Sequence, residues 1–330
     1  MEKPVISIII PCFNSEKTIV KTIESVSNQK GIINSDYEIL AINDGSTDAT
    51  LKVLNRLKNK LNGINLRVMS LTKNSGVSFA RNYGIKYANG KWVQFLDSDD
   101  LLNLNALKEI IRDSKQLGDC DLITYSYYAK NSKKRDYSSN RFSNHFFCKL
   151  ELLKLFLSKK IDFHISALVI KREFLLSKNI QFEPNKKVAE DLQFLIRCLY
   201  HIQKSYYKNF HVFTYQVFNS TAMAGYQVFT AEMSRSIAEL YKFFSKINNE
   251  EIKEYLDFYL VNFYVYNLRN LLKSKSYSLD SIRILIKYFF ILKIKIENIN
   301  NKRFLFLRAI QLMPVLCLLH LYIWRKNFVN

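Results

Sequence analysis

The 330-residue sequence is poor in the residues that usually punctuate loops, with only 8 glycines and 4 prolines. Its five cysteines stand singly, without a Cys-x-x-Cys pair or another metal-ligand spacing, which argues against a zinc site and a disulfide framework. No signal-peptide pattern opens the chain, because charged residues lead directly into a strand-like run. The sequence therefore predicts reduced cysteines and a cytoplasmic protein.

Acidic residues are also in the minority, with 29 Asp and Glu against 49 Lys and Arg and a formal net charge of +20. A basic surface attracts polyanions such as nucleic acid, anionic lipid or phosphorylated substrates. No zinc-finger spacing, Arg-rich arm or convincing helix-turn-helix pattern is present, so we expect no nucleic-acid partner. Hydrophobic residues make up 48% of the chain, which is enough for a sizeable core.

Strand-like apolar runs alternate with amphipathic stretches in the first part of the chain. Strands are expected at residues 5–10, 37–42, 66–71, 92–96 and 121–126, with helices near residues 19–26, 51–61, 77–88 and 104–117. Asn14 or Ser15 is expected to cap the first helix, and Gly90 to end the third in a left-handed conformation. This alternation predicts an α/β fold with a Rossmann-like, mostly parallel sheet between flanking helices.

The rest of the chain is less regular. Residues 127–144 are polar and predict a loop, residues 163–170 and 206–218 predict strands, and a helix is expected from residue 189. From about residue 226 the pattern is helical to the end. We therefore expect a catalytic domain over residues 1–225 and a helical, basic and aromatic region over residues 226–330.

Polar loops follow each of the first four expected strands, and ligands of open parallel sheets bind at that edge. Asp97 and Asp99 follow the fourth strand, where two carboxylates either hold Mg²⁺ or Mn²⁺ or simply cap a helix. Asp44, in the second loop, either accepts a hydrogen bond from a nucleobase or belongs to a plain turn. Arg81 either binds a phosphate or pairs with a nearby acid.

A further acidic pair, Glu190 and Asp191, opens a later helix. The helix dipole favours acids at that position, which is the structural interpretation. The functional interpretation is a general base that takes a proton from an attacking hydroxyl.

Taken in order, these motifs resemble those of the family 2 glycosyltransferases. The matching stretches are residues 5–14 (VISIIIPCFN), 42–48 (INDGSTD), 74–76 (NSG), 80–84 (ARNYG), 95–100 (FLDSDD) and 190–191 (ED). The resemblance covers roughly residues 4–220. It implies the GT-A fold, an inverting mechanism, a nucleotide-sugar donor, a metal cofactor and the synthesis of a bacterial surface polysaccharide.

The resemblance also implies which residues contact the donor nucleotide. Those residues are Pro11, Phe13, Asn14, Asp44, Lys73, Asn74, Arg81 and Asp97. Among them Asp44 would recognise a uracil-type base, and Arg81 would face the phosphates.

The resemblance assigns the chemistry to a second group of acids. Asp99 would bind Mg²⁺ or Mn²⁺ directly, with Asp97 in the same metal shell. Asp191 would be the catalytic base, and Glu190 and Asp100 would support the site.

Two stretches depart from the family pattern. Processive members carry Gln-x-x-Arg-Trp after the base, whereas residues 193–198 here read QFLIRC, which predicts addition of a single sugar. Many relatives also carry a Tyr-Arg pair on a late strand, and Gln216 stands in place of that Arg. A phosphate contact from that strand is therefore not expected.

The last part of the chain mixes large apolar residues with single cations. Residues 304–324 are long enough to span a membrane, but they contain Arg308, Gln311 and His320. Interfacial attachment, packing on the core or another copy, and a true span are all compatible with the pattern. We expect peripheral attachment to an anionic surface at the inner face of the cell membrane, which would suit a glycan acceptor carried on a lipid.

Two other functions compete with glycosyl transfer as interpretations of the sequence. A sugar nucleotidyltransferase would usually carry a Gly-rich loop after the first strand, and residues 11–16 contain no glycine. An inactive, membrane-associated scaffold or glycan-binding protein could keep the fold, but it would not need to keep Asp44, Asp97, Asp99 and Asp191.

Overall fold

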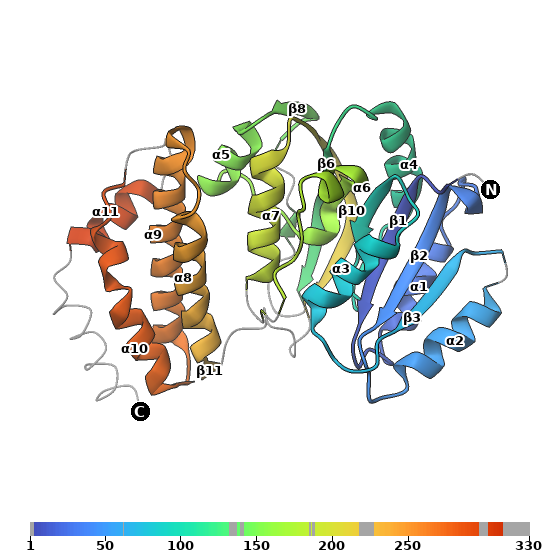
Figure 1. The fold of residues 1–330 in the computed structure, drawn as a ribbon, viewed down its shortest axis with the longest axis horizontal. Coiled ribbons are helices and arrows are strands. Elements are labelled where there is room, and N and C mark those ends of the chain that lie inside the picture. Colours follow the sequence, from blue (N-terminus) through green and yellow to red (C-terminus); the bar gives the residue numbers. More distant parts are fainter. Residues whose placement is uncertain are drawn as a thin grey trace. The chain divides into compact units, whose positions relative to one another are not determined.

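The structure is a computed structural model that describes residues 3–61, 63–131, 137–138, 142–184, 186, 189–217, 228–296 and 303–312. The chain packs as two compact units (Figure 1). The first consists of Met1–Leu153 and Asp162–Thr221, and the second of Lys154–Ile161 and Ala222–Asn330. The expected boundary between residues 225 and 226 falls outside the described residues and stays a prediction.

A ten-stranded sheet forms the centre of the first unit, with the order β3-β2-β1-β4-β9-β6-β10-β5, while β7 pairs with β6 and β8 with β10. The strands are β1 (Ile6–Cys12), β2 (Tyr37–Asn43), β3 (Leu66–Ser70), β4 (Trp92–Phe95), β5 (Leu101–Leu102), β6 (Leu122–Asn131), β7 (Tyr137–Ser138), β8 (His145–Cys148), β9 (Leu168–Lys171) and β10 (Lys204–Val217).

Helices lie on both faces of this sheet (Figure 1). They are α1 (Ile19–Ser27), α2 (Thr50–Lys60), α3 (Val77–Tyr87), α4 (Ala106–Gln116), α6 (Arg172–Ser177) and α7 (Glu190–His201), with 3-10 turns η1 (Asn34–Asp36) and η2 (Ile165–Ala167). The helix α5 (Glu151–Leu157) begins in the first unit and belongs to the second from Lys154 on. The prediction of an α/β, mostly parallel sheet with flanking helices is confirmed.

The register of the central strands explains why their loops meet. The neighbouring strands β3, β2, β1 and β4 are all parallel. Cys12, the last residue of β1, pairs with Asn43 at the end of β2, and Asn43 pairs with Ser70 at the end of β3. Every residue of β1 and β2 is buried, as the unbroken apolar runs predict for strands covered on both faces. The loops that follow these strands therefore leave the sheet at one edge.

Two local predictions are wrong. The first helix begins after Thr18, and neither Asn14 nor Ser15 is its N-cap residue. Gly90 does not adopt a left-handed conformation. The helix α3 ends at Tyr87 with Ala88 as its C-cap residue, and a Cβ on Gly90 would lie 2.5 Å from the backbone nitrogen of Ser7. Glycine is required there because the chain passes against β1, not because the helix ends there.

The second half of the sheet also differs from the prediction. The expected strand at residues 163–170 is a 3-10 turn, η2, followed by the short strand β9. This strand lies antiparallel between β4 and β6, because the chain enters it from the opposite edge. The predicted loop at residues 127–144 contains the end of β6 together with β7, while residues 132–136 and 139–141 are outside the described part.

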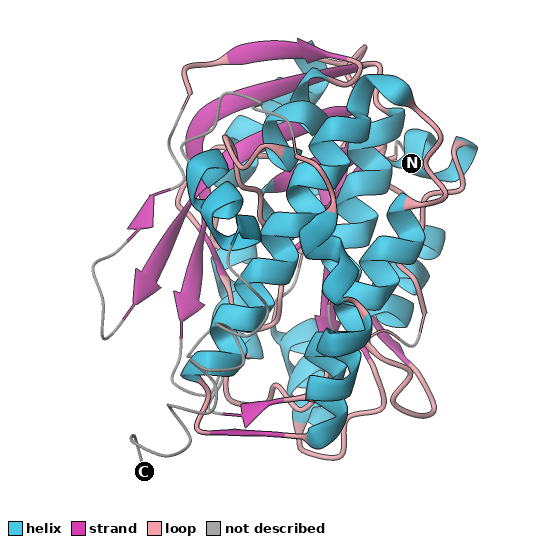
Figure 2. Cartoon of the chain, turned by 90° about the vertical axis from the view of Figure 1, so that its left-hand side faces the viewer, coloured by secondary structure: helices cyan, strands magenta, loops and turns pink. Residues whose placement is uncertain are grey.

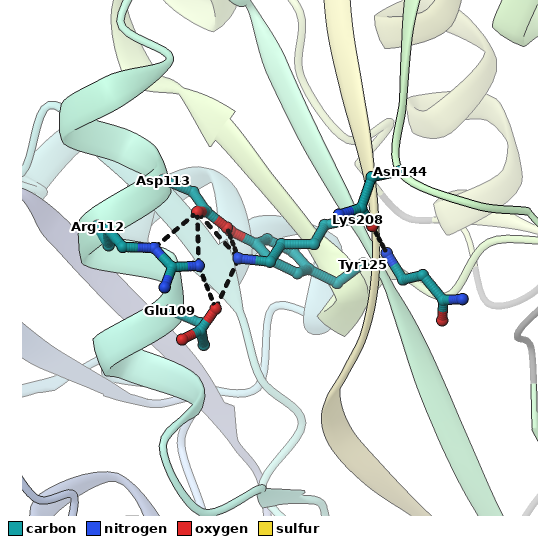
Figure 3. Close-up of polar contacts among 7 residues, drawn as sticks. Glu109, Arg112, Asp113, Tyr125, Asn144 and Lys208 are labelled. Carbon is teal, nitrogen blue, oxygen red and sulfur yellow. Dashed lines mark hydrogen bonds and ion pairs between the residues drawn. The ribbon is translucent and has the colours of Figure 1, made fainter.

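A buried charged cluster ties α4 to β6 and β10 (Figure 3). The Nζ atom of Lys208 lies 2.6 Å from a carboxylate oxygen of Glu109 and 2.7 Å from one of Asp113. Tyr125 donates its hydroxyl to the same Asp113 carboxylate at 3.1 Å, and burial followed by the Asp113 charge raises the pKa of that phenol. Because the β10 register shifts just after Lys208, the cluster holds the strand at an irregular position.

The described part of the second unit is helical apart from a pair of two-residue strands (Figure 2). Its elements are β11 (Val228–Phe229), α8 (Ala231–Phe244), α9 (Glu250–Lys273), β12 (Ser276–Tyr277), α10 (Leu279–Lys287), η3 (Phe289–Lys293) and α11 (Arg303–Leu312). Tyr264 of α9 donates its hydroxyl to the carbonyl of Leu285 in α10 at 2.6 Å. The predicted helical C-terminal region is confirmed over these elements.

A bilayer-spanning helix is absent from the described part of the chain. Residues 313–330, which include much of the apolar run at 304–324, lie outside it.

Candidate active site

A cavity of about 700 Å³ opens at the sheet edge where the first four loops leave the strands. Each of those loops contributes to its wall, and α3 closes one side. The lining residues are Pro11, Cys12, Phe13, Asn14, Ser15, Thr18, Asp44, Asn74, Gly76, Val77, Ala80, Arg81, Asp97, Ser98 and Asp99. The volume falls within the range of about 300–1,000 Å³ that is usual for small-molecule sites.

The first two loops are joined by the side chain of Asn14. The side-chain Oδ1 atom accepts a hydrogen bond from the backbone N–H of Thr47 at 2.9 Å, and the backbone N–H of Asn14 donates to the hydroxyl of Ser46 at 3.0 Å. Asn14 has a φ of 49°, a left-handed conformation that Asn tolerates better than most residues. The Asn at position 14 therefore suits this wall of the cavity in two ways: its side chain bonds the second loop, and its backbone tolerates the left-handed conformation.

The second and third loops are joined by Asp44 and Gly45. The two carboxylate oxygens of Asp44 accept the backbone N–H groups of Ser75 and Gly76, each at 2.8 Å, and only 2% of Asp44 is exposed. Gly45 has a φ of 62°, and a Cβ there would lie 2.4 Å from the backbone carbon of Lys73. Any residue other than glycine would push the two loops apart.

Arg81 of α3 is the buried cation of the site. Its Nη2 donates to Asp97 at 2.8 Å, and its Nη1 lies 3.7 Å from a carboxylate oxygen of Glu190. Burial opposes the charge on Arg81, but the carboxylates of Asp97, Glu190 and Asp191 outweigh it and raise the guanidinium pKa. Nε and Nη1 are buried and find no hydrogen-bond partner among the described residues, which leaves Arg81 with donors for an anionic ligand.

Phe182 packs against this guanidinium. The Cζ atom of Arg81 lies 5.2 Å from the centroid of the Phe182 ring, and that ring stacks on Phe194 of α7 at 3.8 Å. Asn82 fixes the Phe182 backbone by donating to its carbonyl at 2.8 Å and accepting its N–H at 2.9 Å. Phe182 thereby connects the cation in α3 with the helix that carries Glu190 and Asp191.

The acids after β4 differ in their surroundings. Burial would raise the pKa of Asp97, but Arg81 and then His164 hold it below its ordinary value. Burial and the neighbouring Asp97 charge raise the pKa of Asp99. Asp97 also has ligand atoms within 4.8 Å of those of Asp100 and His164, a grouping that could hold a metal ion.

His164 stands in an aromatic wall next to these acids. Its ring centroid lies 5.6 Å from Tyr127, 4.9 Å from Phe213 and 5.0 Å from Tyr215. Nδ1 accepts the backbone N–H of Ser166 at 3.2 Å, so the neutral imidazole carries its proton on Nε2. Burial lowers the pKa of His164, although the charges of Asp97 and Asp191 act in the opposite direction. The neutral imidazole, which can donate from Nε2, is therefore favoured.

Glu190 and Asp191 begin α7, directly after Ala189, whose φ of 62° is left-handed. The side chain of Glu190 is 16% exposed, and burial followed by the Asp191 charge raises its pKa. Asp191 is exposed and accepts the backbone N–H of Leu192 at 2.7 Å. Asp191 therefore offers an accessible carboxylate, whereas Glu190 is engaged with Arg81.

The residues expected at the site fall into two groups. Those in the cavity wall are Pro11, Phe13, Asn14, Asp44, Asn74, Arg81, Asp97 and Asp99, and those outside it are Lys73, Asp100, Glu190 and Asp191. Glu190 is nevertheless connected to the wall through Arg81, and Asp191 acts electrostatically on Arg81 and His164. The structure adds His164 and Phe182, which the sequence does not distinguish because neither lies in a motif. The side chain of Gln216 lies outside the described residues.

The sequence comparisons define the class of protein. A profile of Glycosyl transferase family 2 matches residues 7–175, and the chain belongs to this family of sugar-transferring enzymes. The predicted family is confirmed, and glycosyl transfer is favoured over nucleotidyl transfer.

Several characterised or named proteins are similar to the chain. Poly(ribitol-phosphate) beta-N-acetylglucosaminyltransferase TarP of Staphylococcus aureus is 34% identical over 59% of this chain and 57% of its own length. Minor teichoic acid biosynthesis protein GgaB of Bacillus subtilis is 30% identical over 61% of this chain and 21% of its own length. An uncharacterized glycosyltransferase of Haemophilus influenzae is 31% identical over 62% of this chain and 76% of its own length. The chain thus spans little more than half of TarP and about a fifth of GgaB.

Solved structures confirm the predicted GT-A fold. The crystal structure of residues 1–349 of S. aureus TarS covers 87% of this chain and 80% of its own, at 20% identity and a TM-score of 0.67. The same TarS fragment in complex with UDP-GlcNAc has a TM-score of 0.63 at 22% identity, over 89% of this chain and 77% of its own. Mannosyltransferase PcManGT from Pyrobaculum calidifontis, in complex with GDP-Man and Mn²⁺, has a TM-score of 0.55 at 18% identity, over 100% of this chain and 89% of its own.

Proposed function

We propose that this protein is an inverting, metal-dependent glycosyltransferase that moves a single sugar from a UDP-sugar to a hydroxyl of a surface glycan. One observation carries the proposal. Arg81 is paired with Asp97 and Glu190 in the wall of a cavity of nucleotide size, and its buried Nε and Nη1 atoms have no hydrogen-bond partner among the described residues. A buried guanidinium with unused donors suits a diphosphate, which accepts charge-assisted hydrogen bonds.

The acids of the wall fit a divalent cation. Asp97 and Asp99 bring oxygen ligands to the cavity, and their mutual repulsion contributes to the raised pKa of Asp99. Mg²⁺ or Mn²⁺ on Asp99 and Asp97 would relieve this repulsion and would offset the charge that develops on the leaving diphosphate. Asp100 lies close to Asp97 and is the supporting acid of this set.

The base would be Asp191. In an inverting transfer the acceptor oxygen attacks the anomeric carbon from the side opposite the diphosphate, so its proton needs a carboxylate on that side. Asp191 is exposed at the start of α7, on a segment separate from the loops that hold Asp97 and Asp99. Glu190 supports the base by pairing with Arg81 on the donor side.

The relatives guide the choice of donor and acceptor. TarS has been crystallised with UDP-GlcNAc, and TarP is named for transfer of N-acetylglucosamine to poly(ribitol phosphate). We propose a UDP-linked hexose or N-acetylhexosamine as donor. The acceptor would be an anionic surface glycan, free or lipid-linked, to which the net charge of +20 is electrostatically complementary.

Donor specificity can be tested by measuring nucleotide release from a panel of UDP-, GDP- and dTDP-sugars, with Mn²⁺ or with EDTA. We expect UDP release from one UDP-sugar with Mn²⁺, and loss of the activity with EDTA or in Asp99→Ala, because the diphosphate charge is then uncompensated. An equal rate in EDTA would contradict metal dependence. Release from GDP- or dTDP-sugars alone would contradict the UDP assignment.

We propose that the protein is cytoplasmic and attached peripherally to the inner face of the membrane. The support lies in an exposed stripe along α10 and η3, here called the basic–apolar stripe. It consists of Leu279, Arg283, Ile286, Lys287, Phe290 and Lys293. Leu279 is 70% exposed, Ile286 63% and Phe290 42%. Single exposed apolar side chains are common, but several gathered on one surface indicate a binding site. Cations beside exposed apolar groups are typical of protein surfaces that insert into the lipid headgroup region of a membrane.

The stripe can be tested with vesicles. We expect the full chain to sediment with vesicles containing phosphatidylglycerol and not with pure phosphatidylcholine. The double variant Ile286→Glu, Phe290→Glu should bind at least about tenfold more weakly, because it loses apolar burial and adds charges that anionic lipid repels. Ile33→Glu, at an exposed apolar position of the first unit, is the matched control. Equal sedimentation of the double variant and the control would refute attachment through the stripe.

A further inference from the structure

A second cavity, of about 440 Å³, lies on the side of α3 that faces away from the candidate active site. Residues of α3 form one wall, and α6 with the segment after it forms the other; we call it the α3–α6 groove. Val77, Ala80 and Arg81 of α3 line the first cavity, whereas Phe79, Tyr83 and Lys86 line the groove. With 3.6 residues per turn, these two sets occupy opposite faces of one helix.

The outer face of α3 carries three aromatic rings in a row, of which Phe79 and Tyr83 line the groove and Tyr87 lies beside it in the helix. Phe79, Tyr83 and Tyr87 follow one another at intervals of four residues, with ring centroids 6.3 Å apart for the first pair and 4.5 Å for the second. Phe79 is 41% exposed and Tyr87 37%, and Leu176 on the α6 wall is 50% exposed. Large apolar side chains gathered around a concavity and left in water indicate a surface that binds a ligand.

The charge of the groove has one sign. Lys86 and Arg172 are the charged residues that line it, and no Asp or Glu is among the lining residues of this described cavity. Arg172 is fixed in place because its Nε and Nη2 donate to the carbonyls of Ile85 and Lys86, each at 2.8 Å. Two exposed amide side chains, Asn179 and Gln181, add hydrogen-bonding groups to the other wall. The groove therefore combines flat apolar rings, neutral polar groups and fixed positive charge.

We propose that the α3–α6 groove binds an anionic glycan, namely a stretch of the acceptor polymer remote from the hydroxyl that reacts; this rests on the proposed function. Sugars and polyols offer C–H faces to aromatic rings and hydroxyls to amides, and phosphodiesters or carboxylates between them pair with Lys86 and Arg172. A lipid surface would use the rings but not the amides. We assign the groove to a carbohydrate chain because all three kinds of group line the same cavity.

Holding the polymer in this groove would raise the local concentration of its other units around the first unit of the protein. Phe79 and Tyr83 line the groove and do not line the candidate active site. Their loss should therefore affect the use of long acceptors and leave the chemistry on a single unit unchanged.

Affinity electrophoresis of the full chain through gels containing poly(ribitol phosphate) tests binding without turnover. We expect retardation of the wild-type protein and at least about tenfold weaker retention of Phe79→Ala, Tyr83→Ala. Phe146→Ala removes an aromatic ring that is 43% exposed elsewhere in the first unit and should behave as wild type. In transfer assays the double variant should show a raised KM for the polymer, with kcat and the rate on a single-unit acceptor unchanged.

Three outcomes would overturn the proposal. One is equal retardation of the double variant and the wild type. Another is equal retardation of the wild type by neutral dextran, which would remove the requirement for negative charge. The third is a change of sedimentation coefficient with protein concentration that the double variant abolishes, which would make the groove a contact between copies. Asp191→Asn should keep the retardation, so a failure of the proposed chemistry would remain distinguishable from a failure of the groove.

Discussion

Replacing Asp191 by Asn is expected to reduce sugar transfer by about 10²–10⁴-fold, the usual contribution of a general base. The amide keeps the size of the side chain but cannot take the proton of the acceptor hydroxyl. Binding of UDP should be unchanged, because Asp191 does not line the nucleotide-sized cavity. Steady-state transfer rates together with calorimetric titration of UDP separate the two effects.

Two other variants sharpen this experiment. Asp280→Asn changes an acid that also lies in the first turn of a helix, and it controls for the loss of a favourable helix-dipole interaction. Glu190→Gln tests the neighbouring acid, which the structure engages with Arg81. Wild-type transfer by Asp191→Asn combined with inactivity of Glu190→Gln would move the role of base to Glu190.

The largest expected effect on stability comes from Lys208→Met. The side chain of Lys208 is 11% exposed and that of Asp113 6%. Removal of Lys208 leaves the half-exposed Arg112 as the cation that still pairs with both Asp113 and Glu109. Breaking a buried ion pair from one side typically costs about 3–5 kcal/mol. We expect the lower end, about 3 kcal/mol, because Arg112 and Tyr125 still contact Asp113.

The matched control for this variant is Lys115→Met, in the same helix as Asp113. Lys115 pairs with Asp36 at 2.9 Å but is 53% exposed, so its loss should cost no more than about 1 kcal/mol. Hydrogen exchange of the β6 and β10 amides measures the stability of this region separately from the second unit. Equal protection in the two variants would mean that the buried cluster contributes no more than a surface pair.

The sequence predicted the central strands well because their chemistry is unambiguous. A run such as residues 5–10, apolar and mostly β-branched, fits only a strand covered on both faces, and the polar residues after it mark the ligand-binding edge. The direction of β9 was not predictable in the same way. A short apolar run shows that a strand exists but carries no information about which neighbours it pairs with or in which sense.

The candidate site shows a similar division. The sequence singles out Asp44, Asp97 and Asp99 because they follow strand ends in polar loops, and Arg81 because it lies one turn into the helix after such a loop. His164 and Phe182 carry no such signal, since a single His or Phe in an apolar stretch is normally a core residue. Their importance comes from contacts across the fold, such as the approach of Phe182 to Arg81, which sequence spacing does not encode.

The ties between the loops have a consequence for engineering this protein. Asn14 connects the first loop to the second, and the Asp44 carboxylate connects the second to the backbone at Ser75 and Gly76. Replacing one of these loops with a relative's sequence would remove one partner of these hydrogen bonds and leave the other partner in the loop that was not replaced. Attempts to retarget the enzyme to a different nucleotide should therefore transplant the three segments as a set.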